Sequence, residues 1–574
     1  MWAFTNKHII YTQDRDGDEN RVVYVIDLTD GKTIALTPPE GVAAKLFPLS
    51  EKYPDEILVG LNERNSNFQD VYSINFITGK RTLVYTNNRY FDLISDSNFQ
   101  VRFGYKQQPD GGYSLEKLDS KNTGHQLLQV PFADYNTWGL HLDQTGKILY
   151  LTDTLERNTT AVSAINLETG MKTVLASDPA VDVDDVYAIT QNPKSGRIQA
   201  AAFATDRRKW QVIDSNLTGD INYLSQAEPG ELYIIDRSLN DQYWIVSYVT
   251  DQSSDIYYLY DHFNKTLHPL INSPLQSSLP FASTKPIHFA ARDGTIISGF
   301  LTIPLWQENY FPLIVLIHGG PHDRDFWDFN PERQWLANRG YAVLNVNFRG
   351  SRGFGKNFLN QGSQQWGGTI LNDITDGINW AIHQNITRSG KIAVMGSSFG
   401  GYASLMLAAK IPNQLTSAIS FAGPVDLISD LERRAETGNP TLESELAREG
   451  DFRSVSGRKL LTQYSPISLT NLPNVPVLIG QGIQDARVTK EDIDRYVEVL
   501  SKAKKPRTYL VFPEEGHFIS NDENQMAYYG AVEAFLSVHL KGKLEPIGNT
   551  LSNTNLQIPV NTNVIPGIPM STVQ

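Results

Sequence analysis

The sequence contains no cysteine, although it runs to 574 residues. Disulfide bonds, thiol-based catalysis and cysteine-ligated zinc are therefore excluded. The chain also lacks an excess of basic residues, since its formal net charge is −13, and nucleic-acid binding normally requires clustered lysine and arginine. It contains no apolar run long enough to cross a bilayer. These absences predict a solvated acidic surface without nucleic-acid or membrane partners, and the length predicts two large domains.

No secretory signal precedes the first predicted strand, which begins almost at residue 1. We therefore expect a cytoplasmic protein. An exported form remains open if the start of the chain is truncated, because a protein without cysteine fits either compartment. We also expect no metal and no organic cofactor.

The first half of the chain repeats one unit, in which a strand ending in a polar residue is followed by a turn and another strand. Five copies carry a turn glycine, and these lie at intervals of 48, 45, 46 and 49 residues: Gly31, Gly79, Gly124, Gly170 and Gly219. A sixth, weaker copy covers residues 258–266. The segments are short, aromatic and β-branched, which is typical of strands rather than helices. Four strands fit each interval, so residues 1–282 are predicted to form an all-β propeller of about six blades.

The second half contains a strand, a sharp turn and a helix around Ser398. Residues 392–395 are apolar, residues 396–401 read Gly-Ser-Ser-Phe-Gly-Gly, and an apolar face at helical spacing follows. A nucleophile turn forces its serine into strained backbone geometry and tolerates only small residues at Gly396 and Gly400. Ser398 is therefore the candidate nucleophile, although the short motif alone also occurs by chance.

Two further candidates follow short apolar strands downstream. Asp485 comes after the strand at residues 475–479, and His517 comes after the strand at residues 508–512. Both side chains are expected at the same sheet edge as Ser398, because the carboxyl ends of parallel strands share an edge. The order serine, acid, histidine is that of an α/β-hydrolase. Taken singly, each residue could be an ordinary turn or capping residue.

These residue types suit nucleophilic catalysis. His517 would take the serine proton, and Asp485 would hold the imidazole tautomer and stabilise the imidazolium. The oxyanion would need two donors. The backbone N–H of Phe399 is one candidate, and the N–H of Gly320 is the other, because a strand at residues 313–317 leads into His-Gly-Gly-Pro.

Six motifs together resemble the prolyl oligopeptidase family of serine peptidases, and within it lie closest to the acylaminoacyl-peptidase branch. They cover residues 318–322, 347–355, 366–368, 396–402, 485–488 and 515–517. The resemblance implies that Ser398, Asp485 and His517 are catalytic and that Gly320 and Phe399 supply the oxyanion donors. His318 stands where some branches carry an oxyanion tyrosine, which favours the acylaminoacyl branch. The resemblance also implies that Arg487 contacts a substrate carbonyl, while a solvated loop arginine is the alternative.

The family usually has seven or more blades, whereas six copies are visible here. Either the propeller closes with six blades, or the chain as given lacks a first blade. A missing blade would expose sheet edges that invite association, and a homo-oligomer is then an expected consequence. The resemblance further implies that the propeller admits short peptides and excludes folded proteins.

The domain boundary is predicted near residue 283, with a mostly parallel, doubly wound α/β-hydrolase domain over residues 283–541. Residues 426–464 form a charged helical insertion, for which we expect a solvated face, with a lid or domain contact as the alternative. Residues 542–574 contain no aromatic residue and are expected to be a disordered tail.

The leading hypothesis is a serine peptidase that hydrolyses short peptides through an acyl-enzyme, with an acylaminoacyl or dipeptidyl preference. A carboxylesterase of the same fold is the second hypothesis. A propeller binding module with an inactive hydrolase is the third, and it belongs to a different class.

Overall fold

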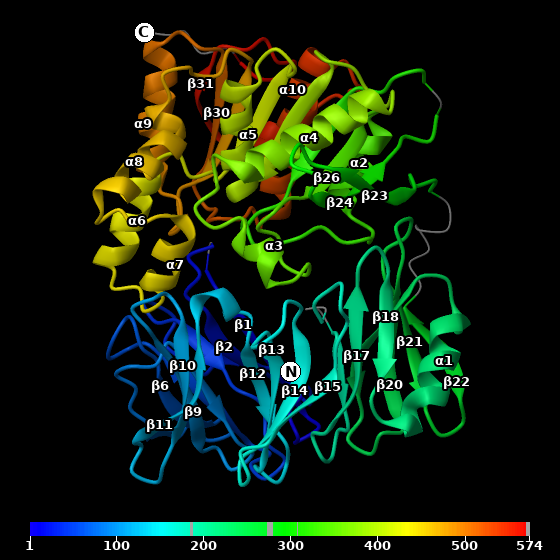
Figure 1. Cartoon of the computed structure of the whole chain (residues 1–574), viewed down its shortest axis with the longest axis vertical. Coiled ribbons are helices and arrows are strands. Elements are labelled where there is room, and N and C mark those ends of the chain that lie inside the picture. The colour runs from blue at the N-terminus through cyan, green and yellow to red at the C-terminus, as the bar shows by residue number, and fades with distance from the viewer. Residues whose placement is uncertain (16, 184–186, 272–278, 307, 570–574) are drawn as a thin grey trace. The chain divides into compact units, whose positions relative to one another are not determined.

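The computed structural model describes the chain except residue 16, residues 184–186 and 272–278, residue 307, and residues 570–574 (Figure 1). Two compact units are present: Met1–Leu175 with Leu431–Arg448, and Ala176–Asp430 with Glu449–Gln574. The predicted division near residue 283 instead follows the change of sheet, since β22 ends at Ile271 and β23 begins at Thr284. None of the described helices combines the length and apolar character needed to span a bilayer.

The first unit contains four antiparallel sheets in chain order, which are the first four blades of the propeller. The first sheet has three strands and the others have four: β1 (His8–Gln13), β2 (Val22–Asp27), β3 (Thr33–Ala35); β4 (Ala44–Leu46), β5 (Glu56–Leu61), β6 (Asp70–Asn75), β7 (Arg81–Tyr85); β8 (Asp92–Ser95), β9 (Val101–Gln107), β10 (Tyr113–Leu118), β11 (Gly124–Val130); β12 (Trp138–Leu142), β13 (Ile148–Asp153), β14 (Ala161–Asn166), β15 (Lys172–Ala176). Apolar residues of neighbouring sheets share cores, such as Ile10 of β1 with Ile57 of β5. The predicted turn glycines Gly31, Gly79 and Gly170 each adopt positive φ between the last two strands of their sheet.

The second unit contains the remaining two sheets of the propeller: β16 (Ile189–Gln191), β17 (Ile198–Ala204), β18 (Arg208–Val212); and β19 (Glu231–Arg237), β20 (Tyr243–Val249), β21 (Ile256–Asp261), β22 (Thr266–Ile271). The described residues therefore form six blades, as predicted. The prediction of a turn at Gly219 is wrong, because this glycine lies in helix α1 (Thr218–Ala227), which follows η2 (Ser215–Leu217) where the fourth strand was expected. Asp214 caps η2 by accepting the N–H of Asn216, so the chain coils there instead of turning back.

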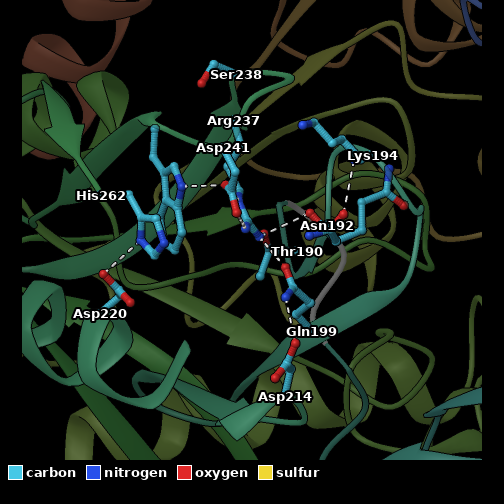
Figure 2. A network of polar contacts seen from close by, with 12 residues as sticks. Thr190, Asn192, Lys194, Gln199, Asp214, Asp220, Arg237, Ser238, Asp241 and His262 are labelled. Atoms are coloured by element: carbon cyan, nitrogen blue, oxygen red, sulfur yellow. Dashed lines mark hydrogen bonds and ion pairs between the residues drawn. The ribbon is translucent and has the colours of Figure 1, made fainter. Parts of the chain in front are cut away.

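A polar network joins the fifth and sixth blades (Figure 2). Arg237, at the end of β19, forms a two-pronged ion pair with Asp241, with N–O distances of 2.8 and 2.6 Å. Its guanidinium also donates to Gln199 of β17 at 2.8 Å, and Gln199 in turn donates to Asp214. The guanidinium lies 4.3 Å from the Trp244 ring centroid. The Arg237–Asp241 pair lies within the sixth blade, and the hydrogen bond to Gln199, donated by an arginine side chain that is only 4 % exposed, links that blade to the fifth.

The rest of the second unit is built on a nine-stranded sheet in the order β23-β24-β26-β25-β27-β28-β29-β30-β31. Six neighbouring strands, from β26 to β30 in that order, run parallel, and the outer strands pair antiparallel. The strands are β23 (Thr284–Ala290), β24 (Ile296–Thr302), β25 (Leu313–Ile317), β26 (Ala342–Asn347), β27 (Ile392–Ser397), β28 (Ser417–Phe421), β29 (Val477–Gly482), β30 (Arg507–Phe512) and β31 (Gln557–Asn561). The central strands are buried throughout, as expected for parallel strands covered on both faces. This architecture is the predicted α/β-hydrolase fold.

Helices cover both faces of this sheet: α2 (Pro331–Asn338), α3 (Lys356–Asn360), α4 (Thr369–His383), α5 (Phe399–Lys410), α8 (Val455–Tyr464), η3 (Pro466–Ser468), α9 (Lys490–Lys502) and α10 (Asp522–Leu540). α10 and α2 share one apolar core with alternate residues of the strands, including Val343. α4 lies on the opposite face (Figure 1), where Gly377 closely approaches Val346.

The charged insertion forms α6 (Leu427–Glu436), α7 (Leu442–Glu449) and α8. For Leu431–Arg448 the alternative expectation, a domain contact, agrees with the structure, because these residues belong to the unit of the first four blades. The guanidinium of Arg448 lies 4.7 Å from the Phe132 ring centroid, next to η1 (Phe132–Asp134), and burial lowers the pKa of Arg448 to about 10. Gly111 also approaches Ala447 closely. The charges on these helices therefore accompany a packed contact.

The prediction of a disordered tail is wrong for residues 542–569. They contain η4 (Thr550–Asn553) and β31, and β31 pairs with β30 at the edge of the large sheet. Ile565 and Ile568 are buried in the core formed with α10. The segment lacks aromatic residues but is held by backbone pairing and by Asn563, whose amide donates to Thr508 at 2.9 Å. Residues 570–574 lie outside the described residues.

Candidate active site

Ser398 occupies the turn between β27 and α5 with φ 54° and ψ −123°. This conformation is rare for a residue with a side chain and is sustained only by its surroundings. A Cβ added at Gly396 would lie 2.6 Å from the carbonyl oxygen of Ile317, and one added at Gly400 would lie 2.1 Å from the same oxygen. Both glycines are therefore required for β25, β27 and α5 to pack so closely. The turn has the geometry expected of a nucleophile elbow.

Asp485 lies three residues beyond β29 and is 4 % exposed. Its Oδ1 accepts the backbone N–H groups of Arg487 and Val488 at 2.8 and 2.9 Å. Its Oδ2 accepts from the amide of Gln481 at 3.3 Å and from Nδ1 of His517 at 2.8 Å. These donors fix the carboxylate in one orientation, with one oxygen directed at the imidazole.

His517 follows β30 and is 3 % exposed. A carboxylate only accepts hydrogen bonds, so Nδ1 carries the proton that is donated to Asp485, and Nε2 of the neutral ring is left as an acceptor. Glu515, two residues earlier, is completely buried and accepts from Ser520, Asn521 and Asn524. Glu515 therefore holds together residues 515–524, the segment that carries His517 and is called the histidine loop below.

Sequence reasoning assigned no role to Glu515 or Gln481. Glu515 was visible only as part of the motif before His517, and Gln481 as the penultimate residue of a buried strand. A polar residue inside a completely buried strand is a signal that could have indicated Gln481, because such a side chain needs partners.

The structure brings Asp485 and His517 together and places Ser398 at the same edge of the sheet. The three residues follow β27, β29 and β30, which lie in one parallel block with β28 between the first two. Within the described part of the chain, the Ser398 hydroxyl forms no hydrogen bond with His517. Such contacts are often long or poorly aligned without substrate and tighten only in the complex.

The candidate oxyanion loop lies against the serine. A Cβ added at Gly319 would be 3.7 Å from the Ser397 carbonyl oxygen and 3.8 Å from the Ser398 Cβ. Gly320, with φ 109°, follows directly. Phe399 is the first residue of α5, so its N–H has no acceptor within the helix. The two predicted donors thus belong to backbone segments next to Ser398, the loop after β25 and the start of α5.

Arg487 is exposed, and its backbone N–H binds Asp485. Its guanidinium lies 5.9 Å from the ring centroid of Phe518, the residue after His517. The arginine therefore stands beside the histidine loop, and its contact with substrate remains a prediction.

Comparison with known proteins agrees with this fold. Residues 327–543 match the model of the prolyl oligopeptidase family. Dipeptidyl aminopeptidase BIII of Pseudoxanthomonas mexicana is 34 % identical over 581 residues, which cover 99 % of this chain and 84 % of that protein. Dipeptidyl peptidase family member 6 of Caenorhabditis elegans is 29 % identical over 590 residues, which cover 95 % of this chain and 79 % of the relative.

Solved structures support the architecture over nearly the whole chain. A puromycin-hydrolysing peptidase of Mycobacterium tuberculosis has a TM-score of 0.74 at 16 % identity and covers 94 % of this chain and 87 % of its own. Oligopeptidase B of Leishmania major has a TM-score of 0.70 at 14 % identity, covering 93 % of this chain and 77 % of its own. The propeller and α/β-hydrolase fold, together with the relatives, define a serine-type peptidase. The chain belongs to the prolyl oligopeptidase family.

Proposed function

We propose that the protein hydrolyses short peptides through an acyl-enzyme formed on Ser398. The observation that carries this proposal is the buried pair of His517 and Asp485, joined at 2.8 Å on the same sheet edge as the strained Ser398. A serine hydroxyl is a weak nucleophile at neutral pH and needs a positioned base. Nε2 of His517 is the ring atom left for that role.

In the first step, Ser398 Oγ attacks the scissile carbonyl while His517 Nε2 takes the hydroxyl proton. The Asp485 carboxylate stabilises the imidazolium that results. The N–H groups of Gly320 and Phe399 donate to the oxyanion of the tetrahedral intermediate. His517 then returns the proton to the leaving amine, and the acyl-enzyme remains.

In the second step, water attacks the acyl-enzyme with His517 again as base, and Ser398 is released with its proton. Arg487 is proposed to bind a substrate carbonyl near the histidine loop. The dipeptidyl preference gains support from the two relatives that align along almost the whole chain, both of which are dipeptidyl peptidases by name. The acylamino-acid-releasing enzyme of rice matches only 41 % of the chain.

The test compares three substrates with the same purified enzyme: a free-amino dipeptidyl anilide, an acetyl-aminoacyl anilide and a p-nitrophenyl ester. The proposal predicts turnover of the dipeptidyl anilide, loss of turnover in Ser398→Ala, and weaker activity on the acetylated substrate. An enzyme that is fast on the ester and inert to both anilides would be a carboxylesterase, and the peptide proposal would then be wrong.

A further inference from the structure

The loop of residues 349–355 forms the support on which the oxyanion loop lies. Nδ1 of His318 donates to the Gly319 carbonyl oxygen at 2.8 Å, which leaves Nε2 to accept from the Ser351 hydroxyl at 3.0 Å. Nδ1 of His322 donates to the Gly350 carbonyl oxygen at 2.8 Å. Two histidines that flank Gly319 and Gly320 are thus bonded to consecutive residues of the supporting loop.

The supporting loop is itself held by an aspartate from the propeller part of the chain. Oδ2 of Asp182 accepts the N–H groups of Gly353 and Gly355 at 3.0 and 3.1 Å, and the Asp182 N–H donates to the Gly353 carbonyl oxygen at 3.1 Å. Asp182 is 6 % exposed, and the next residue, Val183, bridges to Phe203 of β17. The carboxylate therefore connects the fifth blade to the loop by charge-assisted bonds, which are stronger than neutral ones.

Arg324 forms a second connection at the same place. It lies two residues beyond His322, is 7 % exposed, and donates to the carbonyl oxygens of Ala204 and Thr205 in the fifth blade at 3.2 and 3.3 Å. A Cβ added at Gly353 would lie 2.3 Å from its Nη1. The guanidinium thus packs directly on the glycine whose N–H binds Asp182.

We propose that Asp182 is a positioning residue for the oxyanion hole. It holds the backbone of residues 353–355, this loop holds His318 and His322 through residues 350 and 351, and the two histidines fix the N–H of Gly320 relative to Ser398. The inference rests on the proposed function, because it assigns Gly320 as an oxyanion donor. A shift of about 1 Å in such a donor costs on the order of 10²-fold in rate.

The kinetic test uses Asp182→Ala, Asp182→Asn and a matched control in the full chain. Asp143 suits the control because it is also 6 % exposed and its Oδ1 accepts two backbone N–H groups, those of Lys147 and Ile148, in the fourth blade. On the anilide that the wild type cleaves faster, Asp182→Ala should lower kcat by about 10- to 100-fold with KM within about 2-fold. Asp182→Asn keeps an acceptor oxygen and should recover kcat to within about 5-fold of wild type. Asp143→Ala should leave kcat within about 2-fold of wild type, because Asp143 contacts none of the residues that link Asp182 to Gly320.

A second readout reports on the oxyanion hole itself. A peptide aldehyde forms a tetrahedral adduct whose oxygen occupies the hole, so its affinity should fall in Asp182→Ala by about the same factor as kcat/KM. A variant that is only less stable would have a smaller fraction of folded, active enzyme, but that fraction would bind the aldehyde with wild-type affinity. Wild-type kcat in Asp182→Ala, or unchanged aldehyde affinity, overturns the proposal.

Two measurements keep the proposal testable if Asp182→Ala does not fold or if no substrate is cleaved. Ser351→Ala removes only the hydroxyl that holds His318 and should lower kcat at unchanged KM; wild-type kcat there overturns the proposal. Hydrogen exchange of residues 318–324 should quicken in Asp182→Ala, or in Ser351→Ala if Asp182→Ala does not fold, and not in Asp143→Ala; exchange equal to wild type overturns the proposal without any reaction. A wild type that cleaves no anilide and resists a fluorophosphonate refutes the proposed function instead.

Discussion

Nδ1 of His517 lies 2.8 Å from Oδ2 of Asp485, with the two side chains 2 % and 0 % exposed. In this environment the carboxylate decides which ring nitrogen carries the proton. Asp485→Asn would present an amide in place of an acceptor and favour the wrong tautomer. We expect kcat for the preferred anilide to fall on the order of 10³- to 10⁴-fold, with a melting temperature close to that of wild type. Steady-state kinetics check this, and a loss under about 10-fold would contradict the role of Asp485.

Gly400→Ala tests the packing of the nucleophile elbow. The new Cβ would lie 2.1 Å from the Ile317 carbonyl oxygen, a backbone atom that cannot rotate away. We expect a loss of about 2–4 kcal/mol in the free energy of unfolding, together with nearly complete loss of activity. Chemical denaturation measures the first and anilide hydrolysis the second.

Gly219→Ala is the matched control, because Gly219 is likewise the second residue of a helix, with open space around its Cβ position. Alanine there should be neutral or stabilise by up to about 1 kcal/mol. Equal losses in both variants would show that the elbow imposes no special restriction on side-chain size.

The edge strand β31 and the residues after it should contribute to stability. Ile565 is 4 % exposed in the core with α10, whereas its neighbour Val564 is 70 % exposed. Ile565→Ala should therefore cost about 2–3 kcal/mol in the free energy of unfolding, and Val564→Ala less than about 0.5 kcal/mol. Urea denaturation of both variants measures this; similar small effects would restore the expectation of a disordered tail.

Glu332, at the start of α2, predicts a pH dependence of stability. Burial, with the nearby Asp325 carboxylate as a second cause, raises the pKa of Glu332 from 4.5 to about 7. Between these values the folded state binds more protons than the unfolded state, so the contribution of Glu332 to stability falls as pH rises, and the full cost is present above pH 7.

Glu332→Gln removes this titration. The variant should match wild type well below pH 4.5, where the carboxyl is protonated in both states, and gain on it progressively up to pH 7. The gain is expected on the order of 1–3 kcal/mol, since one pKa unit corresponds to about 1.4 kcal/mol and the side chain is partly exposed. Urea denaturation at several pH values measures it, and a difference that does not change with pH would contradict the shift.

The sequence predicted the elements whose signals are local. Ser398 was indicated by glycines two residues away, and Asp485 and His517 by the strands directly before them. Their meeting followed from one rule about parallel sheets. The position of the turn around Gly219 was wrong, because a glycine at the repeat interval also fits the first turn of a helix.

The relationships that the sequence did not indicate join distant segments. Asp182 binds Gly353 across 171 residues, and no periodicity or motif marks such a pair. Residues 557–568 are likewise ordered because they pair with the edge of β30 and pack into the core around α10. The composition of the segment itself indicates neither partner. The conformation of such segments depends on tertiary contacts, whereas the nucleophile turn and the strands can be predicted from local sequence patterns.

The most direct test of the catalytic assignment is covalent labelling of the intact protein with a fluorophosphonate, read by mass spectrometry. The account predicts one adduct per chain, located on the peptide that carries Ser398, no adduct in Ser398→Ala, and much slower labelling in Asp485→Asn. A wild type that stays unlabelled, or an adduct that persists in Ser398→Ala, would contradict it.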